Sequence, residues 1–181
     1  QALSGFIGRK VSDVLLKMEN IKKSFGNNKV VHDFSMEVKR KEKIILIGAS
    51  GSGKTTILRM INYLEYPDEG TVWLDGDYIG KSLSKNGEWV PDTIKQLAEK
   101  RKSIGMVFQN FNLFAHLNAM NNVTLGLTKV LGISKKEAAE RAEAYLEKVH
   151  LKDHMRKYPH EMSGGMQQRV AIARDLWLFN A

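Results

Sequence analysis

The chain has 181 residues, of which 43% are hydrophobic and 27% charged, and its formal net charge is +8. This length supports one domain with its own core, the composition is typical of a soluble globular protein, and no apolar run approaches the roughly 20 residues that a membrane span needs. The absence of cysteine excludes disulfide bonds and thiol chemistry. The positive charge is compatible with binding to nucleic acid, with binding to an anionic membrane surface and with simple solvated lysines. Nucleic-acid binding is not favoured, because no basic stripe with interleaved aromatic residues is present.

The first part of the chain is predicted to form strands and then a helix. Residues 1–13 lack the long apolar core of a signal peptide and are expected to be an N-terminal extension or an expression remnant. Alternating apolar residues over 14–21 predict a first strand, and 34–38 is its expected partner after a turn. The run 43–47 predicts a buried strand, and 56–61 predicts a helix.

A phosphate-binding motif lies between this strand and this helix. Its residues fit G-x-x-x-x-G-K-[ST]; they are Gly48, Ala49, Ser50, Gly51, Ser52, Gly53, Lys54 and Thr55, followed by Thr56. The glycines allow consecutive backbone N–H groups to point into one concavity, and the helix N-terminus adds partial positive charge. Lys54 supplies a full charge to the outer phosphates, and the Thr55 hydroxyl suits Mg²⁺. A merely flexible Gly/Ser loop is the alternative, but the strand–turn–helix context favours a site for a nucleoside triphosphate.

The rest of the chain is predicted to become mainly helical. The expected elements are a hairpin over 70–79, a polar loop over 80–92, a helix over 93–102 and a buried strand over 104–108. Helical patterns follow from 112 to 161, where Ser134 and Glu137 are expected to form a capping box. These patterns predict an α/β core that is interrupted by an all-helical block.

A second glycine-containing turn precedes the last helical pattern. Ser163, Gly164 and Gly165 stand at the expected start of this helix, where exposed N–H groups would suit an anion. Ser-Gly-Gly alone is more often a simple turn before a helix. The sequence Gln-Gln-Arg-Val-Ala-Ile-Ala-Arg at 167–174 removes most of this ambiguity.

With these motifs the chain resembles the ATP-binding subunits of ABC transporters over residues 15–174. The signature of that family is Leu-Ser-Gly-Gly-Gln, followed by the same eight residues that end at Arg174. Gln109 matches the glutamine of the family's Q-loop, and Phe25 matches the aromatic residue of its A-loop, which stacks on adenine. The segments most similar to importers of polar and basic amino acids are 59–65, 85–87 and 111–116.

The resemblance implies an α/β fold, with a P-loop NTPase core, an antiparallel β subdomain and an inserted all-helical subdomain over 112–161. The ATP-binding domain would comprise 14–181 and be incomplete at its C-terminus. The implied ligands are ATP and Mg²⁺. Two subunits would pair head to tail as a homodimer or with a related subunit. Each ATP would lie between the phosphate loop, Phe25 and Val30 of one subunit and residues 163–165 of the other.

Further roles follow from the resemblance. Lys54 and Gln109 would be catalytic, and Thr55 and Gln109 would contact the metal. A core aromatic is the alternative for Phe25, and a solvated loop amide is the alternative for Gln109. The implied partners are transmembrane permease subunits and, indirectly, an extracytoplasmic solute-binding protein. The subunit would then be peripheral at the cytoplasmic face of the cell membrane, and nucleic acid is not an expected partner.

Departures from the family pattern bear on catalysis. Met166 replaces the signature glutamine, and the tail 175–181 stands where an apolar strand ending in Asp-Glu, the Walker B element, is expected. The two carboxylates that would order Mg²⁺ and polarise water are absent, and the tail offers only Asp175, on the signature helix. We therefore expect this chain to hydrolyse ATP at or near background. The alternatives are an ABC-type ATPase acting on DNA or ribosomes and a non-catalytic nucleotide-binding module. His150 and His154 have a spacing that can bind zinc, and ordinary surface histidines of the helical block are the alternative.

Overall fold

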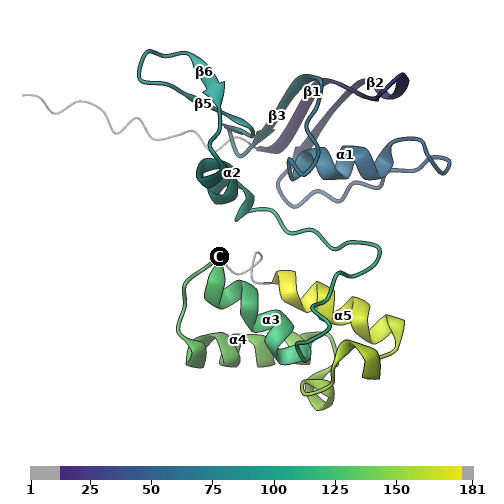
Figure 1. Cartoon of the computed structure of the whole chain (residues 1–181), viewed down its shortest axis with the longest axis vertical. Coiled ribbons are helices and arrows are strands. Elements are labelled where there is room, and N and C mark those ends of the chain that lie inside the picture. Colours follow the sequence, from purple (N-terminus) through teal and green to yellow (C-terminus); the bar gives the residue numbers. More distant parts are fainter. Residues whose placement is uncertain (1–12, 177–181) are drawn as a thin grey trace, which may run out of the picture. The chain divides into compact units, whose positions relative to one another are not determined.

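The computed structural model describes residues 13–176, which belong to two compact units, 1–100 and 101–181 (Figure 1). Apart from Asp13, the expected N-terminal extension lies outside the described residues, as do residues 177–181 of the tail. Within 13–176 no helix combines the length and apolar character needed to cross a bilayer.

An antiparallel sheet dominates the first unit, with strand order β2-β1-β3-β4. The strands are β1 (Val14–Phe25), β2 (Asn28–Lys39), β3 (Glu69–Leu74) and β4 (Asp77–Tyr78). Both predicted hairpins are therefore present. Met18 on the central strand pairs with Met36 and Val72, so one face of the sheet is apolar. Lys17 pairs with Glu37 and Trp73 on the opposite face, as period-two alternation requires.

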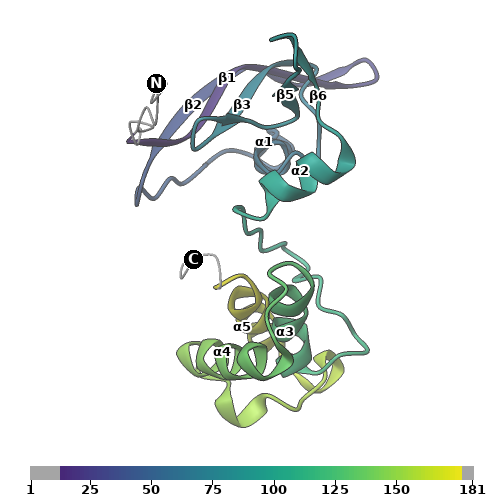
Figure 2. The ribbon, with the colours of Figure 1, turned by 90° about the vertical axis from the view of Figure 1, so that its left-hand side faces the viewer.

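Helix α1 (Lys54–Ile61) packs on the apolar face of this sheet (Figures 1 and 2). Its buried residues, Ile57 and Met60, share a core with Met18 and Val72. Because residues three apart lie on one helical face, these two side chains reach the sheet together. This packing fixes the direction in which the first turn of α1 presents its backbone N–H groups.

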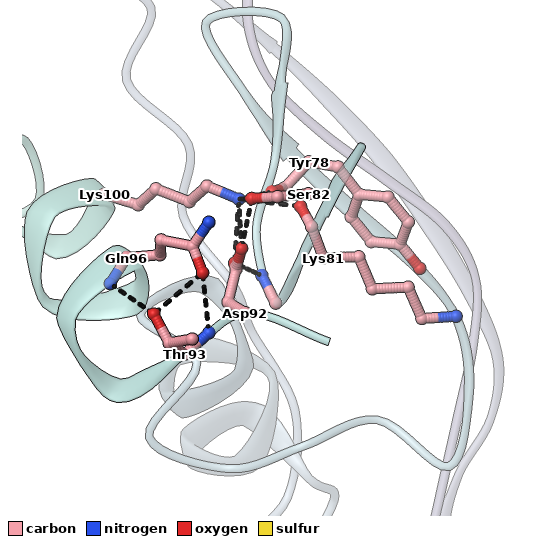
Figure 3. A network of polar contacts seen from close by, with 8 residues as sticks. Tyr78, Lys81, Ser82, Asp92, Thr93, Gln96 and Lys100 are labelled. Atoms are coloured by element: carbon pink, nitrogen blue, oxygen red, sulfur yellow. Dashed lines mark hydrogen bonds and ion pairs between the residues drawn. The ribbon is translucent and has the colours of Figure 1, made fainter. Parts of the chain in front are cut away.

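The prediction of a polar loop over 80–92 is wrong. The segment forms a second antiparallel hairpin of β5 (Lys81–Leu83) and β6 (Trp89–Pro91), which is followed by α2 (Ile94–Arg101). Polar residues that suggested a loop bond to one another instead: Asp92 accepts from Ser82 and from the Gly80 N–H. Thr93 and Gln96 cap α2 reciprocally, and Lys100 reaches back to Asp92 (Figure 3).

The two central strands predicted over 43–47 and 104–108 are also absent. Neither segment pairs with any strand among residues 13–176. Ile45 and Ile47 are 82% and 91% exposed, although the half-buried Leu46 packs against the core of the first unit. An apolar run forms a buried parallel strand only where neighbouring strands complete its hydrogen bonds on both sides. The apolar composition of the two segments favours strands, but neither segment has a strand to pair with among the described residues.

The described part of the second unit, up to residue 176, contains three packed helices and two short 3₁₀ turns. The elements are α3 (Ala119–Lys129), α4 (Lys135–Lys148), η1 (Lys152–His154), η2 (Pro159–Glu161) and α5 (Gly164–Asp175). Their shared core includes Val123, Leu127, Leu146 and Val170. Half of the expected capping box is present: the Ser134 Oγ accepts from the Glu137 N–H at 3.2 Å and caps α4, whereas the Glu137 carboxylate pairs with Arg141.

Candidate nucleotide-binding site

The predicted phosphate loop leads directly into α1. Gly53 is the N-cap of this helix, with φ of 84°, and Gly51 has φ of 80°. Both values lie in the left-handed region that favours glycine. Residues 48–52 are exposed, and a Cβ at Gly48 would lie 2.8 Å from the Ser52 Oγ. The loop therefore depends on its glycines, and it presents backbone at the positive end of a helix, as an anion site requires.

Val30 lies against this loop. A Cβ at Gly53 would lie 3.0 Å from the Val30 carbonyl oxygen and 3.2 Å from its Cγ1. The start of β2 therefore packs closely on the residue that begins α1. Because only glycine permits this approach, Gly53 and Val30 hold the loop next to the sheet edge.

Lys54 is held by the loop itself. Its Nζ donates to the carbonyl oxygens of Gly48 at 2.7 Å and Ala49 at 2.6 Å, and to the Ser52 Oγ at 3.2 Å. The side chain thus folds back over the loop, placing a full positive charge beside the exposed glycines. Thr55 is exposed on the first turn of α1, and Thr56 beside it is half-buried. A hydroxyl next to an anion cradle is the type of donor that suits Mg²⁺, so these residues fit Mg-ATP.

Phe25, the last residue of β1, is 48% exposed. It does not belong to the core of the first unit, so the interpretation as a core aromatic is not favoured. The Lys23 Nζ lies 5.2 Å from the centroid of the Phe25 ring. An exposed aromatic ring with one cation held against it offers a surface for stacking.

In the second unit, Gln109 lies in an exposed turn before two residues with unusual backbone angles. Phe111 and Asn112 have φ of 59° and 46°. Arg174 of α5 donates to both of their carbonyl oxygens, at 3.2 and 2.7 Å. The bend after Gln109 is therefore stabilised by the end of the signature helix rather than by glycine.

The sequence analysis did not identify one residue that hydrogen-bonds to the backbone of 114–118, the stretch that follows this bend. The side chain of Asn122, on α3, is fully buried and accepts from the Phe114 N–H at 2.8 Å. Its Nδ2 donates to the carbonyl oxygens of Phe114, Leu117 and Asn118. An asparagine within a helical pattern was the available signal, because such a side chain usually bonds to nearby backbone.

The signature turn forms an exposed helix N-terminus. Ser163 caps α5, with its Oγ accepting from the Met166 N–H at 3.3 Å. Gly164 and Gly165 are exposed, and a Cβ at either position would meet no atom within 4 Å. The twelve-residue helix thus presents open backbone at its positive end.

The structure places Val30 against Gly53 of the phosphate loop, and Phe25 lies in the same unit. Gln109 and residues 163–165 belong to the second. Throughout residues 13–176, no group of three His, Asp or Glu side chains is arranged to hold a metal ion. The predicted metal contacts of Thr55 and Gln109 stay predictions.

Comparison with known proteins decides the family. The family described as ABC transporter matches residues 31–179. The chain belongs to the ABC transporter family. This ABC transporter chain is 46% identical over 166 residues to a probable amino-acid ABC transporter ATP-binding protein of Sinorhizobium fredii. It is 44% identical to the arginine/ornithine transport ATP-binding protein of Pseudomonas aeruginosa. Identity is 41% to the histidine/lysine/arginine/ornithine transport ATP-binding protein of Escherichia coli.

The alignments cover 92%, 89% and 92% of the ABC transporter chain, but only 64%, 63% and 65% of these relatives. A dimeric ATP-binding cassette solved after hydrolysis, bound to ADP and Pi, is similar with a TM-score of 0.75 and 33% identity; the match covers 90% of this chain and 69% of that one. A dimeric bacterial ABC transporter cassette is similar with a TM-score of 0.76 and 32% identity, and the match covers the same shares of the two chains. The predicted fold class, a P-loop NTPase of the ABC type, is confirmed.

Proposed function

We propose that the chain is the ATP-binding, energy-coupling subunit of an ABC importer for polar or basic amino acids. The observation that carries this proposal is the phosphate loop, in which exposed glycines and Lys54 lie at the N-terminus of α1. Relatives whose names include arginine, ornithine, histidine and lysine transport support the substrate class.

The residues of the two units would act on Mg-ATP in distinct ways. The backbone N–H groups of 51–55 would bind the phosphates, Lys54 would exchange its loop contacts for phosphate oxygens, and Phe25 would stack on the base. Mg²⁺, when bound, would neutralise the charge that develops on the phosphates. Thr55 and Gln109 would hold it, and Ser163–Gly165 of a second copy would face the γ-phosphate.

Coupling to transport would require partners. Permease subunits in the membrane would bind the second unit, and a solute-binding protein outside the membrane would deliver the amino acid to them. The subunit would then work at the cytoplasmic membrane face. The related cassettes that were solved as dimers support the pairing of two subunits.

Isothermal titration of the chain with Mg-ATP tests the proposal. Replacing Lys54 by alanine removes a charge-assisted contact to phosphate, so we expect affinity to fall by roughly 10- to 100-fold. Lys95→Ala is the matched control, because Lys95 is an exposed lysine on α2. Equal affinities of the wild type, Lys54→Ala and Lys95→Ala would falsify the assignment of the phosphate loop.

We further propose that a polypeptide of these 181 residues binds ATP without turning it over. The described end of α5 offers Asp175, whose pKa is raised chiefly by burial, although the nearby Arg174 opposes this. Its Oδ2 is buried without a hydrogen-bond partner, and the residue lies at the opposite end of α5 from the Ser163 turn. A phosphate-release assay should give background rates, and steady turnover that Lys54→Ala abolishes would overturn this part of the proposal.

A further inference from the structure

A buried lysine lies two residues before the exposed Phe25. Lys23 is only 9% exposed, and its Nζ donates to the Tyr66 carbonyl oxygen at 2.7 Å. The same Nζ lies 2.8 Å from the Glu65 Oε1 and 3.2 Å from the Asp68 Oδ1. Because three acceptors surround one ammonium, its position is closely determined. Lysines are seldom buried without such partners.

Asp68 fixes the strand on both sides of Lys23. Its Oδ2 accepts from the Ser24 N–H at 2.7 Å, and its own N–H donates to the Lys22 carbonyl oxygen at 2.9 Å. The end of β1 is thus bonded to residues 65–68, which follow α1. The Glu65 N–H in turn donates to the Arg59 carbonyl oxygen in the last turn of α1. A continuous set of bonds therefore runs from the end of β1 to the helix that begins at the phosphate loop.

Charge in this cluster is stable at neutral pH. The pKa of Lys23 is raised, first by its hydrogen bond to Glu65. The hydrogen bond to Asp68 and the attraction of both carboxylates raise it further, despite the opposing effect of burial. The pKa of Asp68 is lowered, first by the hydrogen bond from the Ser24 backbone N–H and then by the Lys23 ammonium, against the smaller effect of burial. The ammonium therefore remains a cation throughout any ordinary assay range.

The ammonium also contacts the proposed adenine platform. It lies 5.2 Å from the centroid of the Phe25 ring, within the range of a cation–π interaction. Gly26, with φ of 57°, begins the turn directly after this ring. An exposed phenyl group at a turn would otherwise choose freely among its rotamers. Lys23 favours the one in which a ring face rests against the cation.

We propose that Lys23 is a positioning residue for nucleotide recognition, which holds the Phe25 ring ready to stack on the base and ties it to the helix of the phosphate loop. This role rests on the proposed function of Phe25 in ATP binding. It predicts that loss of Lys23 weakens recognition of the base while leaving recognition of the phosphates intact.

The experiment compares the affinities of the chain for Mg-ATP and for Mg-tripolyphosphate, which has the phosphates but no base. Lys23→Met should weaken ATP binding about fivefold, the factor expected for a cation–π contact, and change tripolyphosphate binding by less than about twofold. Lys23→Arg, which keeps the charge, should recover most of the loss. Lys22→Met is the control, because Lys22 is exposed and pairs only at the surface with Glu69.

A double variant and a milder variant complete the test. Adding Lys23→Met to Phe25→Ala should cause no further loss of ATP affinity, because the ring that Lys23 positions is already absent. Should Lys23→Met fail to fold by circular dichroism, Asp68→Asn loosens the same ammonium and should show the same selective loss. Equal weakening of ATP and tripolyphosphate, or unchanged ATP affinity, would overturn the positioning role.

Failure of the proposed function is distinguishable from failure of this inference. If Lys54→Ala weakens ATP binding but Phe25→Ala does not, nucleotide binding stands and the positioning role is overturned. If neither variant weakens it, the nucleotide site itself is wrong, and the role of Lys23 is rejected with it.

Discussion

Replacing Lys100 by methionine should destabilise the first unit strongly, although Lys100 is a charged residue far from the phosphate loop in sequence. Its Nζ donates to the carbonyl oxygens of Tyr78 at 2.6 Å and Lys81 at 2.7 Å and to the Ser82 Oγ at 3.1 Å. It also lies 2.9 and 2.8 Å from the two carboxylate oxygens of Asp92 (Figure 3). The contacts join α2 to the β5–β6 hairpin.

The size of the effect follows from burial. The Asp92 side chain is 1% exposed and that of Lys100 is 19% exposed. Removing one partner of a buried ion pair costs about 3–5 kcal/mol, because the other charge is left unpaired. Asp92 keeps two donors, the Gly80 N–H and the Ser82 hydroxyl, which reduces the expected loss to about 2–3 kcal/mol.

Urea unfolding measures this loss. Trp73 and Trp89, with ring centroids 5.7 Å apart, report on the hairpin by fluorescence. A loss of about 2–3 kcal/mol shifts the midpoint by about 1 M, given a slope near 2 kcal/mol per M. Lys95→Met, an exposed substitution on the same helix, should shift it by much less. Equal midpoints for Lys100→Met and Lys95→Met would refute the reasoning, since the pair would then contribute no more than an ordinary surface ion pair.

Acid should remove the same contribution. Burial acts to raise the pKa of Asp92, but the hydrogen bonds and charge of Lys100, together with Ser82 and the Gly80 N–H, lower it overall from 3.8. A depressed folded pKa stabilises the protein above the unfolded value, and this stability is lost as the pH falls through the folded pKa. The wild type should therefore lose stability below about pH 3.8. Asp92→Asn should flatten this acid dependence.

Two further predictions concern separate parts of the chain. Phe25→Ala should weaken ATP and GTP binding alike by roughly 1–2 kcal/mol in a titration, because stacking does not distinguish one base from another. Phe25→Trp should be tolerated for the same reason. A loss of affinity confined to ATP would contradict stacking. Ser134→Ala should lower the free energy of unfolding of the second unit by about 1 kcal/mol, because it removes the N-cap of α4, whereas Ser134→Asp should be nearly neutral. Equal stability of the wild type and both variants in urea would argue against the cap.

Local patterns were sufficient where the structure is local. The glycine-rich loop, the first turn of α1 and the Ser134 cap were all predicted, because each depends on neighbours within a few residues. The strand predicted over 43–47 required partners that no local pattern specifies, and it is not formed within the described residues. The hairpin over 81–91 was missed because its polar composition resembles a loop, whereas the Ser82 side chain bonds to Asp92 and Lys100.

The same limit applied to the candidate site. Phe25 and the phosphate loop were found from motifs, but Lys23 looked like one more lysine in a basic chain. Its partners, Tyr66 and Asp68, are 43 and 45 residues away in sequence. Only the pairing of β1 with the segment after α1 brings them together. Long-range ion pairs of this kind leave no periodic signal.

The resting contacts of Lys54 have a consequence for which anions the loop accepts. Three oxygens of the loop hold the ammonium, so an anion that hydrogen-bonds to Lys54 exchanges its own oxygens for some of these. The exposed N–H groups at the start of α1 offer a second set of contacts beside this ammonium. A polyphosphate makes both sets of contacts at once. A longer phosphate chain therefore gains more from displacing the loop oxygens of Lys54 than a small anion does.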